Sequence, residues 1–144
     1  MEMSEEFLEV NDLGWYASCQ DGLLAHFATG GRGVVPLIVR RSISVYEETY
    51  DYFCSMEASV NVEIVEVNLP KFGSDAQRER YLQSFVNMAS KGLFSYDVSD
   101  EGGYKLIAKP QESKRYYDLP VEIKKILYVL PVRNSNGLRA DDCL

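Results

Sequence analysis

The stretch GWYASCQDGLLAHFAT, residues 14–29, constrains the fold more than any other part of the sequence. Two apolar runs flank an Asp21-Gly22 pair, which tolerates the positive φ angles of a two-residue type I′ turn. The pattern predicts a β-hairpin in which His26 lies opposite Ala17, on the same face as Trp15. The other face also carries apolar side chains, so we expect the hairpin to be covered on both sides.

A helix is predicted next, because Ser44 and Glu47 have the spacing of a capping box. Tyr46, Tyr50 and Phe53 follow at helical intervals, and we expect them to form its buried stripe. A second, longer helix is predicted to begin after a second capping-box pattern, SDAQ at residues 74–77, and to end at KG, residues 91–92. A cation and a glycine both suit a helix C-terminus.

Alternating apolar residues predict the other strands. Residues 60–64 indicate a central strand, residues 94–98 and 104–108 indicate a second hairpin, and a proline confines a short strand near 128–132 to a sheet edge. The sequence therefore predicts a single α+β domain over residues 1–144. Its mostly antiparallel sheet is built from two hairpins and a central strand and packs with two main helices. We expect the acidic lead, 1–12, and the polar tail, 134–144, to fray.

The charges are unevenly distributed. The net charge is −7, and residues 1–70 carry twelve acids against three bases, whereas residues 71–144 carry ten acids against twelve bases. A surface of this sign repels nucleic acid and the inner leaflet of a membrane, and it attracts cationic proteins. We therefore expect a basic protein partner, with no nucleic-acid or membrane partner.

The sequence shows no apolar run of about 20 residues, and its acidic start differs from a secretory signal, so we expect a cytoplasmic protein. Cys19, Cys54 and Cys143 are an odd number without short spacing. They favour reduced, structural thiols over a disulfide framework or a zinc site. No carboxylate or histidine cluster has the spacing of metal ligands, and we expect no cofactor.

Glycines surround Arg32 in the segment Gly30–Gly33. The segment lacks the third glycine of a dinucleotide fingerprint and the Gly-Lys-Ser/Thr of a P-loop, and no predicted helix follows it directly. We interpret it as an irregular turn that leaves Arg32 available to a carboxylate. The alternative hypothesis is a regulatory module that senses a small ligand through this loop.

His26 is the only histidine, and a hydrolase built around it is a third hypothesis. A general base requires a nucleophile and an orienting acid, and the sequence contains neither a serine elbow nor a recognisable cysteine motif. A half-buried sheet residue is the favoured interpretation, so we expect no enzymatic activity.

The candidate partner-binding residues are Glu47, Glu48, Asp51, Tyr52 and Asp21. The first three fall on or near the helix face opposite the predicted apolar stripe. Tyrosine beside acids suits a surface that recognises lysine-rich or arginine-rich proteins. The simpler alternative is a solvated acidic surface near a helix N-terminus.

Several segments together resemble a known class of proteins: GWYA and DGLLAHFATGGRG in the first hairpin, LFSYDV and YKLIAKP in the second, and DLPVEIKKIL. This pattern, over roughly residues 13–130, is similar to small cytoplasmic immunity proteins encoded beside bacterial polymorphic or contact-dependent growth-inhibition toxins. The resemblance implies a non-enzymatic inhibitor that binds one toxin domain, often a nuclease, and blocks or distorts its active site. An acidic inhibitor would meet a basic toxin by fast, electrostatically steered association.

Overall fold

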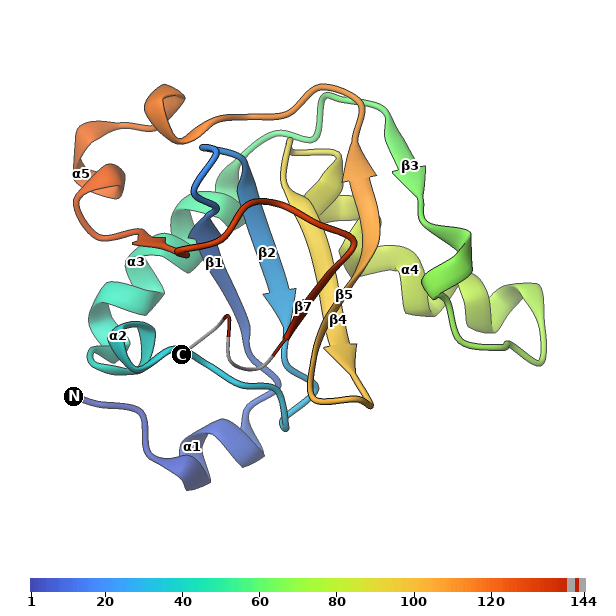
Figure 1. The fold of residues 1–144 in the computed structure, drawn as a ribbon, viewed down its shortest axis with the longest axis horizontal. Coiled ribbons are helices and arrows are strands. Elements are labelled where there is room, and N and C mark those ends of the chain that lie inside the picture. Colours follow the sequence, from blue (N-terminus) through green and yellow to red (C-terminus); the bar gives the residue numbers. More distant parts are fainter. Residues whose placement is uncertain (140–141, 143–144) are drawn as a thin grey trace.

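A twisted sheet forms the centre of the computed structural model, which describes residues 1–139 and 142 (Figure 1). Its strands are β1 (Gly14–Ser18), β2 (Leu24–Ala28), β3 (Val62–Ile64), β4 (Phe94–Ser99), β5 (Gly103–Pro110), β6 (Tyr128–Val129) and β7 (Gly137–Arg139). The helices are α1 (Glu5–Val10), α2 (Leu37–Arg40), α3 (Ile43–Ser55), α4 (Asp75–Ala89) and α5 (Val121–Lys124), with 3₁₀ turns at Glu66–Asn68 and Tyr116–Asp118.

The strand order is β3-β5-β4-β2-β1-β6, and β7 pairs with the same edge of β5 as β3. The β1–β2, β4–β5, β3–β5 and β5–β7 pairs are antiparallel, whereas β1–β6 and β2–β4 are parallel. The predicted class, a single α+β domain with a mostly antiparallel sheet, two hairpins and two main helices, is confirmed. The strand at 62–64 is at the edge of the sheet, not in its centre, because the partner strands of the two hairpins occupy the middle.

The first hairpin has a three-residue loop instead of the predicted two-residue turn. Cys19 N–H donates to Leu23 O at 2.8 Å and Gly22 N–H donates to Cys19 O at 2.9 Å, with Gly22 at φ 84°. This is the geometry of a turn that ends in a glycine bulge. The extra loop residue shifts the strand register by one.

The shifted register changes which side chains share a face. Trp15 lies opposite Phe27, and Tyr16 lies opposite His26. A one-residue shift moves a side chain to the other face of the sheet. His26 is therefore on the face opposite Trp15, and the predicted pairing with Ala17 is wrong.

The α3 helix begins two residues earlier than predicted, because its cap is Ser42 and not Ser44. Ser42 Oγ accepts a hydrogen bond from Val45 N–H at 3.3 Å. Tyr46, Thr49 and Phe53 are its buried residues, which follow an i, i+3, i+7 spacing. Tyr50 is 44% exposed, so its predicted place in the core is wrong.

The α4 helix agrees with the sequence prediction at both ends. Ser74 Oγ accepts from Gln77 N–H at 3.2 Å, and Gln77 Oε1 accepts from Gly73 N–H at 2.7 Å. Gly92 follows the helix at φ 97°, a conformation that ends helices and favours glycine.

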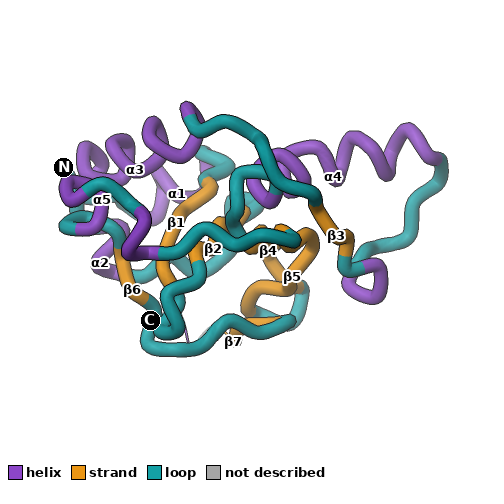
Figure 2. The backbone as a smooth tube through the Cα atoms, turned by 90° about the horizontal axis from the view of Figure 1, so that it is seen from above, coloured by secondary structure: helices purple, strands orange, loops and turns teal. Residues whose placement is uncertain are grey.

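Both faces of the sheet are covered. The α3 and α4 helices pack on one face, and the C-terminal segment, residues 130–139, crosses the other (Figures 1 and 2). We call this segment the C-terminal strap. Its Leu130 and Leu138 are buried in the core, and Tyr96 Oη donates to Ser135 O at 2.8 Å. The described part of the tail is therefore packed, whereas residues 140–141 and 143–144, including Cys143, lie outside the described residues.

The N-terminal lead is also packed, in contrast to the fraying that we expected. Met3 is buried in the core, and its N–H donates to Arg40 O at 2.8 Å. Ile43 N–H donates to Met1 O at 2.7 Å, so the lead is held against the segment that joins α2 to α3. Within the described residues, no helix is long and apolar enough to cross a bilayer.

Candidate functional site

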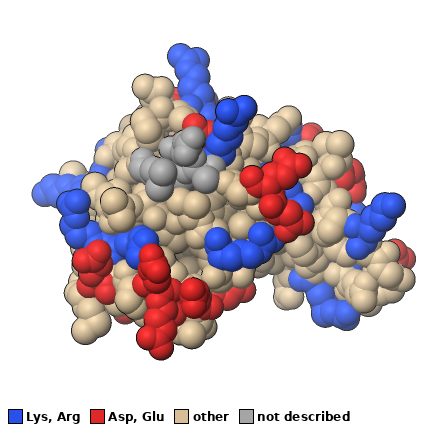
Figure 3. Space-filling model, turned by 60° about the horizontal axis from the view of Figure 1, so that its bottom comes forward, with Lys and Arg blue, Asp and Glu red and all other residues tan. Residues whose placement is uncertain are grey.

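The predicted acidic residues of α3 lie at the surface. Glu47, Glu48 and Asp51 are exposed. Among the described residues, the ion pairs are Arg32–Asp100, Arg78–Glu66 and Lys109–Glu63, so the α3 acids have no basic partner. The view from below shows acidic side chains mainly at its lower left, with a second group right of centre and Lys and Arg between them (Figure 3). The α3 acids are therefore available to an external cation.

A groove of about 310 Å³, lined mainly by apolar residues and also by Lys125, lies between α2, α3 and residues 125–129, on a neighbouring face of α3. Its lining residues Ile38, Val45 and Val129 are 51%, 37% and 47% exposed. Glu48 follows Val45 by three residues, so it projects beside the groove. Exposed apolar residues that cluster next to charge are typical of protein-binding surfaces.

Tyr50 and Tyr52, two of the three tyrosines of this helix, exchange the roles that the sequence suggested. Tyr52 is half-buried, with its ring 5.1 Å from Phe53 in an edge-on contact. Its burial, followed by the negative charge of Glu122, raises the pKa of the Tyr52 hydroxyl. Tyr50 has the more exposed ring of the two. The buried face of α3 includes Thr49 in place of Tyr50, so the helix is rotated relative to the orientation that the sequence predicted.

Asp21 has a structural role away from α3. Its Oδ1 accepts from Leu23 N–H at 3.3 Å, and its Oδ2 accepts from Asn134 N–H at 3.2 Å. Asn134 belongs to the strap, which crosses the sheet face opposite α3 (Figure 2). The structure therefore brings Glu47, Glu48 and Asp51 together on one helix but assigns Asp21 to the hairpin turn and the strap.

A buried lysine anchors the C-terminal end of α3. Lys91 Nζ donates to Phe53 O and to Cys54 O, both at 3.0 Å. These carbonyls belong to the last turn of α3, where helix carbonyls lack partners and a cation is favoured. Sequence analysis placed this cation at the end of its own helix, α4, but its partners are on α3.

His26 is only 5% exposed, and its Nδ1 is hydrogen-bonded to Ser95 Oγ at 2.8 Å. Burial, assisted by the charge of Lys91, lowers the pKa of His26 to about 4. The imidazole is therefore neutral at pH 7. Ser95 is fully buried, so the pair meets no substrate in this conformation and packs as part of the sheet.

The Gly30–Gly33 loop uses its amides internally. Arg32 N–H and Gly33 N–H donate to Thr29 O at 3.1 and 2.9 Å, and Gly31 N–H donates to Thr29 Oγ1 at 3.3 Å. A phosphate cradle needs such amides to point at the ligand. Arg32 forms a 2.7 Å ion pair with Asp100 at the tip of the second hairpin. The ion pair therefore links this loop to the second hairpin. The amides of residues 31–33 already donate to Thr29 and do not form a cradle for a ligand.

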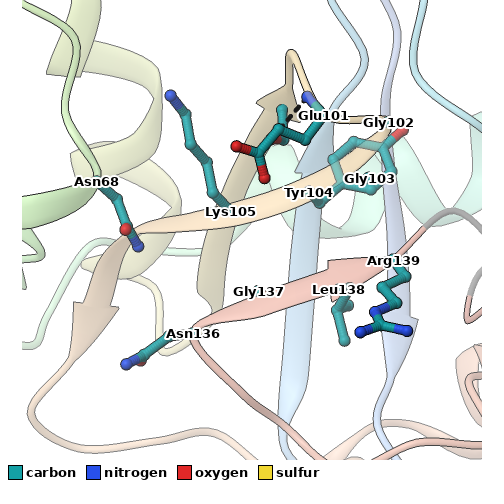
Figure 4. Close-up of a pocket in the computed structure, with 11 residues that line it drawn as sticks. Asn68, Glu101, Gly102, Gly103, Tyr104, Lys105, Asn136, Gly137, Leu138 and Arg139 are labelled. Atoms are coloured by element: carbon teal, nitrogen blue, oxygen red, sulfur yellow. Dashed lines mark hydrogen bonds between the residues drawn. The ribbon is translucent and has the colours of Figure 1, made fainter.

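A second groove, which sequence analysis missed, lies over β5 and β7 and has a volume of about 600 Å³ (Figure 4). Gly103 lies opposite Arg139, and Lys105 lies opposite Gly137. These four residues share one face of the ladder, while Tyr104 and Leu138 between them are buried in the core. The sequence signal was the repeated spacing of one glycine and one cation, GYK and GLR, in two segments that the chain places far apart.

Within the described part of the chain, no group of three or more His, Cys, Asp or Glu side chains is placed to hold a metal ion. No protein-family model matches this chain, and no curated protein or solved structure is significantly similar to it.

Proposed function

We propose that this protein binds a basic protein through the acidic surface of α3 and the adjoining apolar groove. In this proposal it is the immunity protein of a bacterial toxin, and it neutralises a cationic toxin domain by occupying its surface without chemical turnover. The observation that carries the proposal is the exposure of Glu47, Glu48 and Asp51 without a basic partner, beside the exposed Ile38 and Val45.

The two parts of this surface would contribute differently to binding. Acids at an exposed helix raise the association rate with a cationic partner, and salt screens this effect. An apolar groove that accepts a side chain of the partner would slow dissociation, because desolvated anchors carry most of an interface's binding energy. A tight and specific inhibitor requires both properties.

The burial of the polar pair His26–Ser95 supports a protein that binds its partner without chemical turnover. His26 and Ser95 are the one His–Ser contact of the described structure, and both are buried. A hydrolase would need the two groups to reach a substrate. The burial supports a binding role over the hydrolase hypothesis.

The test begins with the protein encoded directly upstream. If its C-terminal domain is exported and toxic, a catalytically inactivated form of that domain is purified, and its association with this protein is measured by surface plasmon resonance at several salt concentrations. A triple variant, Glu47→Gln, Glu48→Gln and Asp51→Asn, should lower the association rate about ten-fold or more at low salt and flatten its salt dependence. The same variant should protect cells less well against the active toxin.

The matched control removes three acids from another helix: Glu5→Gln, Glu6→Gln and Glu9→Gln on α1, which are also exposed. Both triple variants change the net charge equally. If only the α3 variant associates more slowly and protects cells less well, the α3 acids are part of the binding surface. Equal losses in both variants would mean that only total charge matters, and the α3 surface would be rejected. Turnover of a substrate by the purified protein would reject the proposal as a whole.

A further inference from the structure

We infer that the groove over β5 and β7 binds a small organic anion through a single phosphate or carboxylate group. This groove contains neither the α3 acids nor the apolar groove beside them, so the inference does not depend on the proposed partner. Its lining residues come from the second hairpin, the 3₁₀ turn at Glu66–Asn68 and the strap.

The floor of the groove is backbone, because two of its four outward-facing positions are glycine. Gly103 and Gly137 lie diagonally across the β5–β7 ladder and leave the space that larger side chains would fill. The need for glycine differs between them. A Cβ at Gly103 would overlap Leu138 O of the paired strand, whereas a Cβ at Gly137 would lie 3.6 Å from Tyr104 O, an ordinary contact. Only Gly103 is required by the ladder itself.

The other two positions are cations. Lys105 and Arg139 occupy the opposite diagonal, where residues are typically about 7 to 8 Å apart and their Cβ atoms are somewhat closer. Figure 4 shows Lys105 on β5 and Arg139 on β7, with their charged ends directed away from each other. Neither has a carboxylate within ion-pair distance among the described residues. Both side chains are long and flexible enough to turn over the floor and meet one anionic group.

Polar groups at the ends of the groove limit the ligand to a small molecule. Asn68 Nδ2 donates to Leu106 O at 2.8 Å, which fixes this amide at one end, beside Asn136. Glu101 lies on the rim, and its negative charge would repel an extended polyanion. A ligand with one anionic group over the glycines and hydrogen-bonding groups toward Asn68 or Glu101 fits this arrangement. The approximate volume of 600 Å³ is in the range of small-molecule sites.

The test is a titration of the full chain, followed by thermal unfolding and by amide chemical shifts, with glycerol 3-phosphate, inorganic phosphate and propionate as probes and sodium chloride at equal ionic strength as the reference. A bound anion raises the melting temperature by mass action, above the effect of salt. Shift changes should be confined to residues near 68, 101–105 and 136–139. If only the two phosphates raise the melting temperature, the ligand is phosphorylated, and if only propionate does so, the ligand is a carboxylate.

Three variants make the test specific. Lys105→Gln with Arg139→Gln should weaken binding at least ten-fold, and the matched pair Lys71→Gln with Arg80→Gln, both exposed outside the groove, should leave it unchanged. Gly137→Val keeps both cations and suits a strand, yet it fills the floor, so it should abolish binding without loss of stability.

Two results would overturn the inference. One is that no probe acts beyond sodium chloride. The other is that the Lys105/Arg139 variant and the Lys71/Arg80 variant lose binding equally, which would indicate general attraction to surface charge. Circular dichroism of every variant ensures that a lost response reflects the groove and not an unfolded chain.

Discussion

The α3 surface and the β5–β7 groove differ in sign and in construction. On α3, three exposed acids come from one continuous helix, and Glu48 is the one nearest to the groove that Val45 and Thr49 line. In the β5–β7 groove, two cations come from strands that are more than 30 positions apart in the sequence, and they flank a floor of glycine. A helix can therefore display charges that are close together in the sequence, whereas a strand ladder assembles charges from distant segments.

The two surfaces also differ in what holds them in place. The end of α3 is held by the buried Lys91, which bridges from the end of α4 to the last carbonyls of α3. The groove is held by backbone pairing, with Gly103 allowing the strap to approach β5. Disruption of one support should therefore leave the other surface intact.

The largest expected effect follows from removing the support of α3. Lys91→Met keeps an apolar stem of similar length but removes the donor to Cys54 O and leaves Phe53 O with only the 3.4 Å hydrogen bond from Met56 N–H. Hydrogen bonds to a charged group contribute about 1.5 to 3 kcal/mol each, so two contribute about 3 to 6 kcal/mol. Because Phe53 O keeps one donor and Cys54 is exposed, the free energy of unfolding should fall by about 3 to 4 kcal/mol, the lower part of that range. Urea unfolding measures this loss. Lys71→Met, at an exposed position, is the control and should change little.

The next effect is a pH dependence of the interior beneath α3. The pKa of His26 is lowered to about 4 in the folded protein, below its ordinary value of about 6.5. The unfolded chain therefore binds the extra proton in this window, and stability is full above pH 6.5 and is lost as the pH falls toward 4. The contribution is at most about 3 kcal/mol.

Unfolding of the wild type and of His26→Gln should be compared between pH 7 and pH 4. The carboxylates titrate in both proteins, so the difference between the two curves isolates the histidine. Parallel curves would contradict the assigned cause, which is burial assisted by the charge of Lys91.

A substitution at Gly103 should disrupt the β5–β7 pairing that forms the groove. Gly103→Ala places a methyl group against Leu138 O and should destabilise the protein by about 1 to 3 kcal/mol, a typical loss for overpacking. Hydrogen exchange should increase in β7, where Leu138 would lose its packing, while α3 stays protected. Gly137→Ala is the matched control, because its Cβ meets only an ordinary contact. Equal rates of hydrogen exchange in β7 of the two variants would contradict the close approach of the strap to β5 at Gly103.

The smallest effect is expected on the stability of the α3 surface itself. Neutralising Glu47, Glu48 and Asp51 removes exposed charges without partners, so the free energy of unfolding should change by less than about 0.5 kcal/mol per site. A larger loss, measured by urea unfolding, would mean that these acids support the fold and would weaken their assignment to partner binding.

Local signals predicted several elements correctly. Ser74 and Gly92 mark the ends of α4 because capping and a left-handed glycine act within one turn of the chain. The two hairpins and the edge position of β6 also followed from patterns within a few residues. The helix that carries Glu47, Glu48 and Asp51 was also predicted, although from a capping-box pattern at Ser44 that is not its cap.

The sequence predictions were wrong where one extra loop residue, or a small rotation of a helix, changes which side chains face the core. The glycine bulge at Gly22 moved His26 to the face of α3, where Ser95 binds it. The helix that Ser42 caps is oriented so that Thr49 is buried and Tyr50 is exposed. Both alternatives have similar local energies, so packing against the remainder of the chain decides between them.

The sequence by itself determined the α+β class, the two hairpins, the two main helices and the acidic character of the first half, because these depend on neighbours along the chain. Only the tertiary structure decided that Lys91 caps α3, that Asp21 holds the strap, and that Lys105 and Arg139 flank one groove. The physical reason is that hydrogen bonds and strand pairs between distant segments form only when burial of both sheet faces fixes those segments together.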